Sequence, residues 1–566
     1  MNKEQLWFSD FRNTLPLTTK EEKSLIQYVT VALGQQQKKV KLTNNLQEDR
    51  QPRLVFLSLS DGQKTASVIF GSGRGITKAI EEAISQIPRQ LQNIKWIKLD
   101  IVQSVFSLSR LNLKRPLYKQ RSLYGLAFDR ESQIAFLPEE LLTNNLLNTD
   151  LNIRPQNIIK YLGNDSEKAQ AYQRILDSDR IQIYRFTTTS LFSENNQSIS
   201  LYRGHRLFDK LEREQLLAAA FDGGEYLTRA IEPNGKFVYI YQPKTNNVPN
   251  KYNILRHSGT IYSLLELYEI TQNKQFLVTA ETAIAFLLQT FHPYETPQGK
   301  VKCVVEDGFV KLGGNALAAI ALSKYTQVTK SQEYLAIIQE LATWMASVQN
   351  ETGEFVVHKQ SYPEGKVRSF LSEYYPGEAI LAMLRLYQLD SQDRWLDVAA
   401  NAAKFLIEVR DRGLPDSKLP HDHWLLYGLN ELYRHRPEQL YLNHSLRLAH
   451  AIADKQNVNP SYPDWQGSYY QPPRSTPTAT RSEGLYAAYQ LAKFVGKDED
   501  AKTFLAAMKR GIKFQLQTQF QAESVLYLPN PRRAIGGFHR SLTNFEIRID
   551  YIQHNISSLL GLYQII

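Results

Sequence analysis

The sequence predicts two domains, an α+β domain over residues 1–205 and a toroid of about twelve helices over residues 206–566. Two observations favour the toroid. A unit recurs in which a Leu- and Ala-rich helix, a short polar turn and an aromatic–Leu pair follow one another. With outer pieces at both ends, the recurring units give six helix pairs. Such pairs bury their apolar faces against their neighbours, so six of them favour a closed ring around a cavity.

The aromatic–Leu pairs mark where the second helix of each unit begins. They are Phe276-Leu277, Tyr334-Leu335, Trp395-Leu396, Tyr441-Leu442 and Phe504-Leu505. We expect helices over 210–231, 254–270, 274–291, 314–327, 331–349, 373–388, 391–410, 421–434, 437–456, 480–495, 499–519 and 548–565. Links after even-numbered helices are short, and short links make antiparallel hairpins. The even-numbered helices therefore form the inner ring, and the long links, with β-like runs at 236–242, 300–310 and 353–357, share the rim where sites are usually built.

The first 205 residues alternate apolar runs with turn residues. Residues 54–57 and 66–70 flank Asp61-Gly62, which indicates a β-hairpin. A glycine-rich turn at 71–75 then precedes a helix over 77–91, with Thr77 as its N-cap. Further strands are expected over 96–106, 122–128, 133–136 and 181–188. Strand, glycines and helix could cradle a phosphate, but the spacing matches neither nucleotide-binding motif, which favours a structural turn.

Three stretches of this domain resemble the AMMECR1 family: 68–79, 135–139 and 183–186. The resemblance covers residues 50–195 and implies the fold alone. The family's Cys in the glycine-rich turn is replaced here by Ser72 or Gly73, so no chemistry of that Cys carries over.

Composition narrows the class of protein. The formal net charge is +10, yet 57 acidic residues are interspersed and no dense basic block occurs, so we expect no nucleic-acid partner. The chain shows neither a signal peptide nor an apolar run long enough for a bilayer, so we expect a cytoplasmic protein without a membrane partner. The single cysteine, Cys303, excludes a disulfide framework and any multi-Cys zinc site, and we expect no cofactor.

The inner helices begin with unusually polar residues, and the ring would bring these residues to one cavity. Helix N-termini meet there too, and their partial positive charge favours an anionic group. Aromatic side chains among carboxylates and arginines are typical of sugar-binding sites. The organisation over residues 206–566 resembles the (α/α)6 toroids, namely the N-acylglucosamine 2-epimerase-like proteins and the six-hairpin glycosidases. This resemblance is architectural, so it implies a carbohydrate-active enzyme without assigning residues.

We therefore predict a sugar epimerase or isomerase that acts on an acidic or acetamido sugar. The candidate catalytic residues are His257, His423, His554, Asp422 and Glu373. The histidines would donate and accept protons near neutral pH, and one of the two acids would orient a histidine. The candidate substrate-binding residues are Arg256, Arg481, Tyr374, Tyr375, Glu378, Trp424, Trp465, Glu483 and Asp550. The two arginines would hold an anionic or carbonyl oxygen.

Three alternatives remain open from the sequence. A glycoside hydrolase would use two of the carboxylates on an oligosaccharide. A peptide-modifying or peptide-binding protein would use the N-terminal domain for recognition. In a non-catalytic scaffold the candidate residues would have a structural role alone. A metal is not predicted, because His421 and His423 diverge by about 200° on a helix; a site completed by His257 and His554 is only conceivable.

Overall fold

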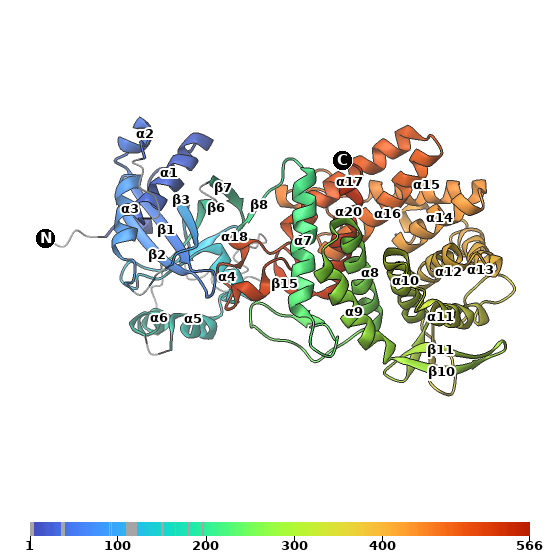
Figure 1. Cartoon of the computed structure of the whole chain (residues 1–566). Helices are drawn as coiled ribbons and strands as arrows, with labels where there is room; N and C mark the ends of the chain where they lie inside the picture. Colours follow the sequence, from blue (N-terminus) through green and yellow to red (C-terminus); the bar gives the residue numbers. More distant parts are fainter. Residues whose placement is uncertain are drawn as a thin grey trace. The chain divides into compact units, whose positions relative to one another are not determined.

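The computed structural model describes residues 5–34, 40–89, 91, 93–108, 122–148, 152–164, 166–177, 182–194 and 197–566. Figure 1 shows the chain, which forms two compact units. Unit 1 comprises Met1–Leu207, Pro243–Asn247 and Phe520–Ile535. Unit 2 comprises Phe208–Gln242, Val248–Gln519 and Gly536–Ile566. Two short segments from the C-terminal part thus belong to unit 1, which the sequence did not suggest. Residues 1–4 and 181, which bear on the predicted start and one predicted strand, lie outside the described residues.

Unit 1 is built on an antiparallel sheet, whose eight described strands include the order β2-β1-β3-β6-β4-β5. The strands are β1 (Pro52–Ser60), β2 (Ser67–Arg74), β3 (Trp96–Leu108), β4 (Gly125–Ala127), β5 (Ala135–Phe136), β6 (Ile183–Glu194), β7 (Gln197–Tyr202) and β8 (His205–Arg206). The helices are α1 (Thr19–Ala32), α2 (Asn44–Gln47), α3 (Ile76–Ser85), α4 (Pro138–Thr143), α5 (Pro155–Leu162), α6 (Glu167–Asp177), α18 (Ala522–Val525) and α19 (Pro531–Ala534). Apolar residues of α1 and α3 form one core with β1 and β3, and those of α4 to α6 form a second core with β4 and β5. The predicted α+β character of this part is therefore present.

The glycine-rich segment is not the turn that the sequence predicted. Gly71 and Gly73 lie within β2, where α3 packs so closely that a Cβ on either residue would clash with the α3 backbone at Ala79. The helix begins at Ile76, so Thr77 lies inside its first turn and is not the N-cap. The Ile76 N–H donates to a carboxylate oxygen of Asp49 at 2.9 Å. A protein carboxylate thus already occupies this helix N-terminus, where a phosphate would have bound.

Unit 2 contains twelve long helices, all within a fully described part of the chain. The inner helices are α8 (Ile254–Thr271), α10 (Leu312–Thr329), α12 (Tyr375–Asp390), α14 (His423–His435), α16 (Ser475–Phe494) and α20 (Ile549–Tyr563). The outer helices are α7 (Arg213–Ala230), α9 (Lys274–Leu288), α11 (Leu335–Ser347), α13 (Asp393–Phe405), α15 (Gln439–Asp454) and α17 (Asp498–Gln517). Each inner helix packs on the next in this order, and α20 packs on α8, which closes the ring. Each outer helix packs on the inner ring, as expected for a toroid of six helix pairs.

Long links precede the inner helices, and several of them pair as small sheets. One sheet contains β10 (Phe291–Thr296), β11 (Gly299–Glu306), β12 (Phe309–Lys311) and β13 (Lys359–Ser361), and another contains β9 (Ile240–Tyr241), β14 (His539–Ser541) and β15 (Asn544–Arg548). The predicted β-like run at 353–357 forms no strand and contributes only a bridge between Gln349 and Phe355. Because helices alternate in direction around the ring, all inner N-termini face the rim of these links.

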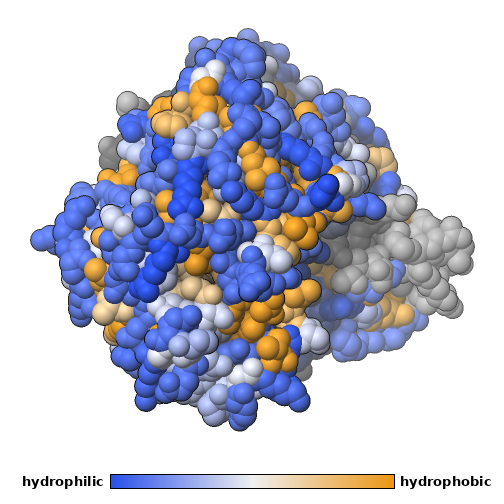
Figure 2. Space-filling model, turned by 90° about the vertical axis from the view of Figure 1, so that its right-hand side faces the viewer, coloured by the Kyte–Doolittle hydropathy of each residue, from blue (hydrophilic) through white to orange (hydrophobic). Residues whose placement is uncertain are grey.

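Figure 2 shows a largely hydrophilic face on which hydrophobic residues lie in separate groups. Among the described residues, none of the helices combines the length and the apolar character that crossing a bilayer requires.

Candidate active site

A cavity of about 500 Å³ opens among the N-terminal halves of the inner helices in unit 2. All six inner helices contribute to its lining, as the ring geometry requires. Nine residues that the sequence predicted for the site line this cavity: Arg256, Tyr374, Tyr375, Glu378, His423, Trp424, Arg481, Asp550 and His554. Most of them lie in the first two turns of their helices, so the closed ring brings together side chains almost 300 positions apart in sequence.

The other five predicted residues lie outside the lining. His257 is fully buried, with 2.7 Å between its Nδ1 and the Tyr252 hydroxyl and 2.9 Å between its Nε2 and the Ala283 carbonyl. Burial lowers the pKa of His257 to about 4. Both ring nitrogens of this neutral imidazole are therefore committed to the protein, and the side chain joins α8 to α9.

Asp422, Glu373 and Trp465 have structural contacts in the links. The carboxylate of Asp422 is the N-cap of α14 and accepts from the Leu425 N–H at 3.1 Å. The Glu373 carbonyl accepts from Arg410. Trp465 packs edge-on against Tyr462, with 4.9 Å between ring centroids. None of these three residues is part of the cavity lining.

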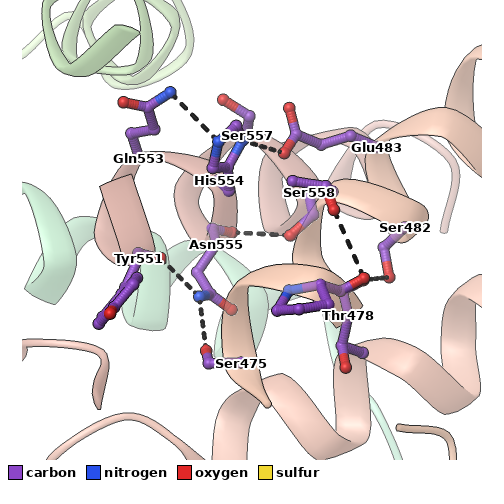
Figure 3. A network of polar contacts seen from close by, with 12 residues as sticks. Ser475, Thr478, Ser482, Glu483, Tyr551, Gln553, His554, Asn555, Ser557 and Ser558 are labelled. Atoms are coloured by element: carbon purple, nitrogen blue, oxygen red, sulfur yellow. Dashed lines mark hydrogen bonds and ion pairs between the residues drawn. The ribbon is translucent and has the colours of Figure 1, made fainter. Parts of the chain in front are cut away.

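The remaining predicted residue, Glu483, lies directly behind the lining. Its Oε1 is 2.8 Å from Nδ1 of His554, and the carboxylate is almost completely buried (Figure 3). Burial raises the pKa of Glu483 to about 7, against the opposing charge of His554. Since Nδ1 is held by the carboxylate, Nε2, which lies 3.5 Å from the side-chain nitrogen of Gln553, is the nitrogen of His554 that a ligand would use.

A buried polar network holds this pair in place, and Figure 3 shows it between α16 and α20. The Asn555 amide donates to Ser475 at 3.0 Å, one residue beyond His554. The side chain of Gln515 on α17 donates to Ser482 at 2.7 Å and accepts from Ser558. These bonds join α20 to α16 and α17 beside the pair. They therefore fix the packing of the two helices that carry His554 and Glu483.

His423 differs from His554 in the hydrogen bonding of its ring nitrogens. It is 3% exposed and lines the cavity, yet neither ring nitrogen has a hydrogen-bond partner among the described residues. Its pKa lies well below the ordinary histidine value because the ring is buried, with the charges of His554 and Arg481 acting in the same direction. The rings of His423 and His554 meet edge-on, with centroids 5.2 Å apart. A buried group with unused hydrogen-bonding capacity points to a ligand.

A metal ion bound in this cavity would use His423, Glu483 and His554 as its ligands. One ligand atom from each lies within 4.8 Å of the others. Two imidazoles and a carboxylate are ordinary metal ligands, but a metal would compete with the bond between Glu483 and His554. His421 has another role, since its Nδ1 accepts from Arg481 Nε at 2.8 Å.

Glu378 is a buried acid on the cavity wall. Its side chain packs against Gly313 of α10, where a Cβ would clash with Oε2, and this oxygen has no partner among the described residues. Burial, with a smaller contribution from the charge of Asp422, raises the pKa of Glu378 well above its usual value. The raised pKa favours the protonated form of Glu378, which can donate a hydrogen bond to a ligand oxygen.

Asp550 is the ionised acid of the lining. It accepts from Arg256 at 3.0 Å and from two nitrogens of Arg548 at 2.5 and 2.8 Å. Although burial opposes ionisation, Arg548 and then Arg256 hold the pKa of Asp550 below its ordinary value. The carboxylate thus fixes two guanidinium groups at the cavity wall.

Sequence reasoning did not single out three arginines of the lining, Arg474, Arg540 and Arg548. Arg474 escaped because α16 begins at Ser475, five residues before its predicted start. Arg474 and Arg548 are the N-cap residues of α16 and α20. A basic residue immediately before an inner helix could therefore have been used to predict a lining residue. Arg540 lies in β14, and no sequence pattern identifies it as a lining residue.

A scan against protein-family models finds no match, and neither does a search of curated proteins. The AMMECR1-like resemblance of unit 1 therefore stays a prediction. Solved structures include a D-mannose isomerase with 14% identity, covering 63% of this chain and 100% of that one, at a TM-score of 0.48. A cellobiose 2-epimerase from Bacillus thermoamylovorans has 15% identity, 62% and 100% coverage and a TM-score of 0.47. The GH76A alpha-1,6-mannanase from Salegentibacter sp. has 12% identity, 62% and 100% coverage and a TM-score of 0.44.

Proposed function

We propose that this protein is a carbohydrate-active enzyme that isomerises or epimerises a sugar by proton transfer in the cavity of unit 2. The observation that carries the proposal is the facing pair of imidazoles. His554 is oriented by a buried carboxylate, and His423 is buried beside it with both nitrogens unused. A neutral imidazole held by an acid is suited to abstract a proton next to a carbonyl group.

The reaction begins with Nε2 of His554 taking the proton from the carbon next to the carbonyl of the open-chain sugar. The electron pair of that C–H bond forms an enediolate with the carbonyl carbon, and negative charge develops on the carbonyl oxygen. The side chains of Glu378 and Arg256 both line the cavity and would stabilise that oxygen. Return of the proton to the former carbonyl carbon, while the proton of the adjacent hydroxyl passes to the former carbonyl oxygen, gives the isomer. Return of the proton to the original carbon from its other face restores the carbonyl group and gives the epimer.

The spacing of the imidazoles favours isomerisation. Ring nitrogens of His423 and His554 lie within 4.8 Å of one another. Two bases acting on opposite faces of one carbon need about 6 to 7 Å between them, because each approaches the carbon to about 3 to 3.5 Å. At this spacing the two histidines would act from one side of the substrate, moving protons between adjacent carbon and oxygen atoms. Aldose–ketose isomerisation needs this arrangement.

A glycoside hydrolase is less well supported by this cavity. It needs an acid and a free carboxylate around the glycosidic bond. Glu378 has the raised pKa of such an acid, but both oxygens of Asp550 are already bound by guanidinium groups. The lining contains no further carboxylate. Peptide recognition by unit 1 has no supporting observation in the described residues.

Incubation of aldoses and ketoses with the full chain in D2O, followed by NMR, tests the proposal. We expect a new aldose or ketose with deuterium entering at the carbon next to the carbonyl. His554→Gln and His423→Gln should each remove this exchange while the fold is retained. New reducing ends from oligosaccharides, without exchange, would instead establish hydrolysis and contradict the proposal.

A further inference from the structure

The cavity has an unusual charge balance. Five arginines line it, namely Arg256, Arg474, Arg481, Arg540 and Arg548. The lining contains two acids, Asp550, whose pKa is lowered by its arginine partners, and Glu378, whose pKa is raised by burial. Five guanidinium groups against two carboxyl groups leave positive charge in surplus in a site of about 500 Å³. Charges of one sign focused in a cleft attract ligands of the opposite sign.

Arg481 is the most buried of these five arginines, so its charge is the most unfavourable to leave without an anion. It is 9% exposed, and its nitrogens donate to His421 Nδ1, the Pro477 carbonyl and the Tyr470 hydroxyl. All these partners are neutral, and the Arg481 charge lowers the pKa of His421 in addition to burial. Among the described residues no carboxylate forms an ion pair with this guanidinium. A buried guanidinium without an anionic partner is unfavourable, and this points to a ligand anion beside Arg481.

Two further arginines reach the same cavity. Arg474 lies one residue before α16, on the helix that carries Arg481, and Arg540 comes from β14. Both side chains are exposed, and the described residues offer neither of them an ion pair. The pair Arg256 and Arg548, by contrast, is held by Asp550. The cavity wall therefore separates into a partly neutralised region at Asp550 and an uncompensated region at Arg474, Arg481 and Arg540.

We propose that the substrate is a sugar carrying an anionic group, a carboxylate or a phosphate monoester, which Arg481 binds together with Arg474 and Arg540. This inference rests on the proposed function and decides between the acidic and the acetamido sugar that the sequence left open. An acetamido group is neutral and would leave the Arg481 charge uncompensated. Planar guanidinium groups bind carboxylate and phosphate oxygens with paired hydrogen bonds, which a neutral amide cannot reproduce.

Kinetics with four matched hexoses test the substrate class: a uronate, a 6-phosphate, an N-acetylhexosamine and the unmodified sugar. We expect kcat/KM for the uronate or the phosphate to exceed that for both neutral sugars by at least roughly 100-fold. The better of the two anions identifies the source of the charge. A neutral sugar converted as well as the anionic ones would overturn the inference but leave the proposed function standing, whereas conversion of none of them would contradict the proposed function.

Anion binding is measured separately, so that it does not depend on finding the substrate. Inorganic phosphate and glucuronate are titrated by calorimetry into the full chain. Arg474→Ala and Arg540→Ala, whose side chains are exposed, and Arg481→Lys should each weaken binding roughly 10-fold or more. Arg434→Ala is the matched control, because this exposed arginine lies in the last turn of α14, at the other rim. Equal affinity of the three variants and wild type, or no binding of either anion to wild type, would overturn the inference.

Discussion

Nδ1 of His554 lies 2.8 Å from Oε1 of Glu483, and this contact joins the last inner helix of the ring to the one before it. The carboxylate sets which nitrogen of the imidazole faces the cavity. His423, 5.2 Å away between ring centroids, has no comparable partner in the part of the chain that the structure describes. The two histidines thus differ in a way that suits different roles, one as an oriented base and the other as a neutral imidazole available to the ligand.

Replacing Glu483 by Gln should lower kcat by roughly 100- to 10,000-fold, because His554 loses the acceptor that orients it and stabilises its protonated form. KM should change little, since Glu483 does not line the cavity. Steady-state kinetics on the preferred sugar provide the measurement. Glu431→Gln is the control. This carboxylate also belongs to an inner helix, but it pairs with Arg385 and does not line the cavity.

The pH profile supplies a second check on the same variant. Glu483 has a pKa of about 7, so wild-type kcat/KM should fall as the pH drops through 7 and the carboxylate becomes protonated. In Glu483→Gln this acidic limb should disappear. A limb that persists unchanged in the variant would show that another group controls it.

Asp422→Asn should change how stability depends on pH. Burial raises the pKa of Asp422 to about 7, whereas an unfolded Asp titrates near 3.9. A folded pKa above the unfolded one means that the contribution to stability is complete below pH 3.9 and is lost as the pH rises to 7. The loss is on the order of 4 kcal/mol. The Asn variant keeps the N-cap and escapes this loss, so its melting temperature relative to wild type should rise between pH 4 and pH 8; parallel curves would refute the assignment.

His257→Leu and His423→Leu should have opposite effects. The first leaves Tyr252 and the Ala283 carbonyl without their partner, which should cost about 2 to 4 kcal/mol of stability while the folded protein keeps its kcat. The second removes no hydrogen bond, so it should leave the melting temperature unchanged or higher and abolish turnover. Thermal unfolding and kinetics on both variants separate the two roles; loss of turnover in a folded His257→Leu would contradict them.

The twelve long helices were predictable because each unit carries its own signal. A Leu- and Ala-rich stretch, a polar turn and an aromatic–Leu pair specify a helical hairpin locally, and the number of hairpins implies the ring. The order of long and short links then identifies the inner helices and their polar N-termini. Nine of the predicted site residues line the cavity for this reason.

Only the tertiary structure decided which of these polar residues reach a ligand. His257 and His423 each occupy the first turns of an inner helix, yet the rotation of α8 turns His257 toward Ala283 on α9, while α14 turns His423 into the cavity. The partnership of Glu483 with His554, and the lack of an anion beside Arg481, depend on packing between helices far apart in the chain. Sequence periodicity determines local structure and the number of elements; distances between elements, and therefore pKa values and unpaired charges, exist only after the ring has closed.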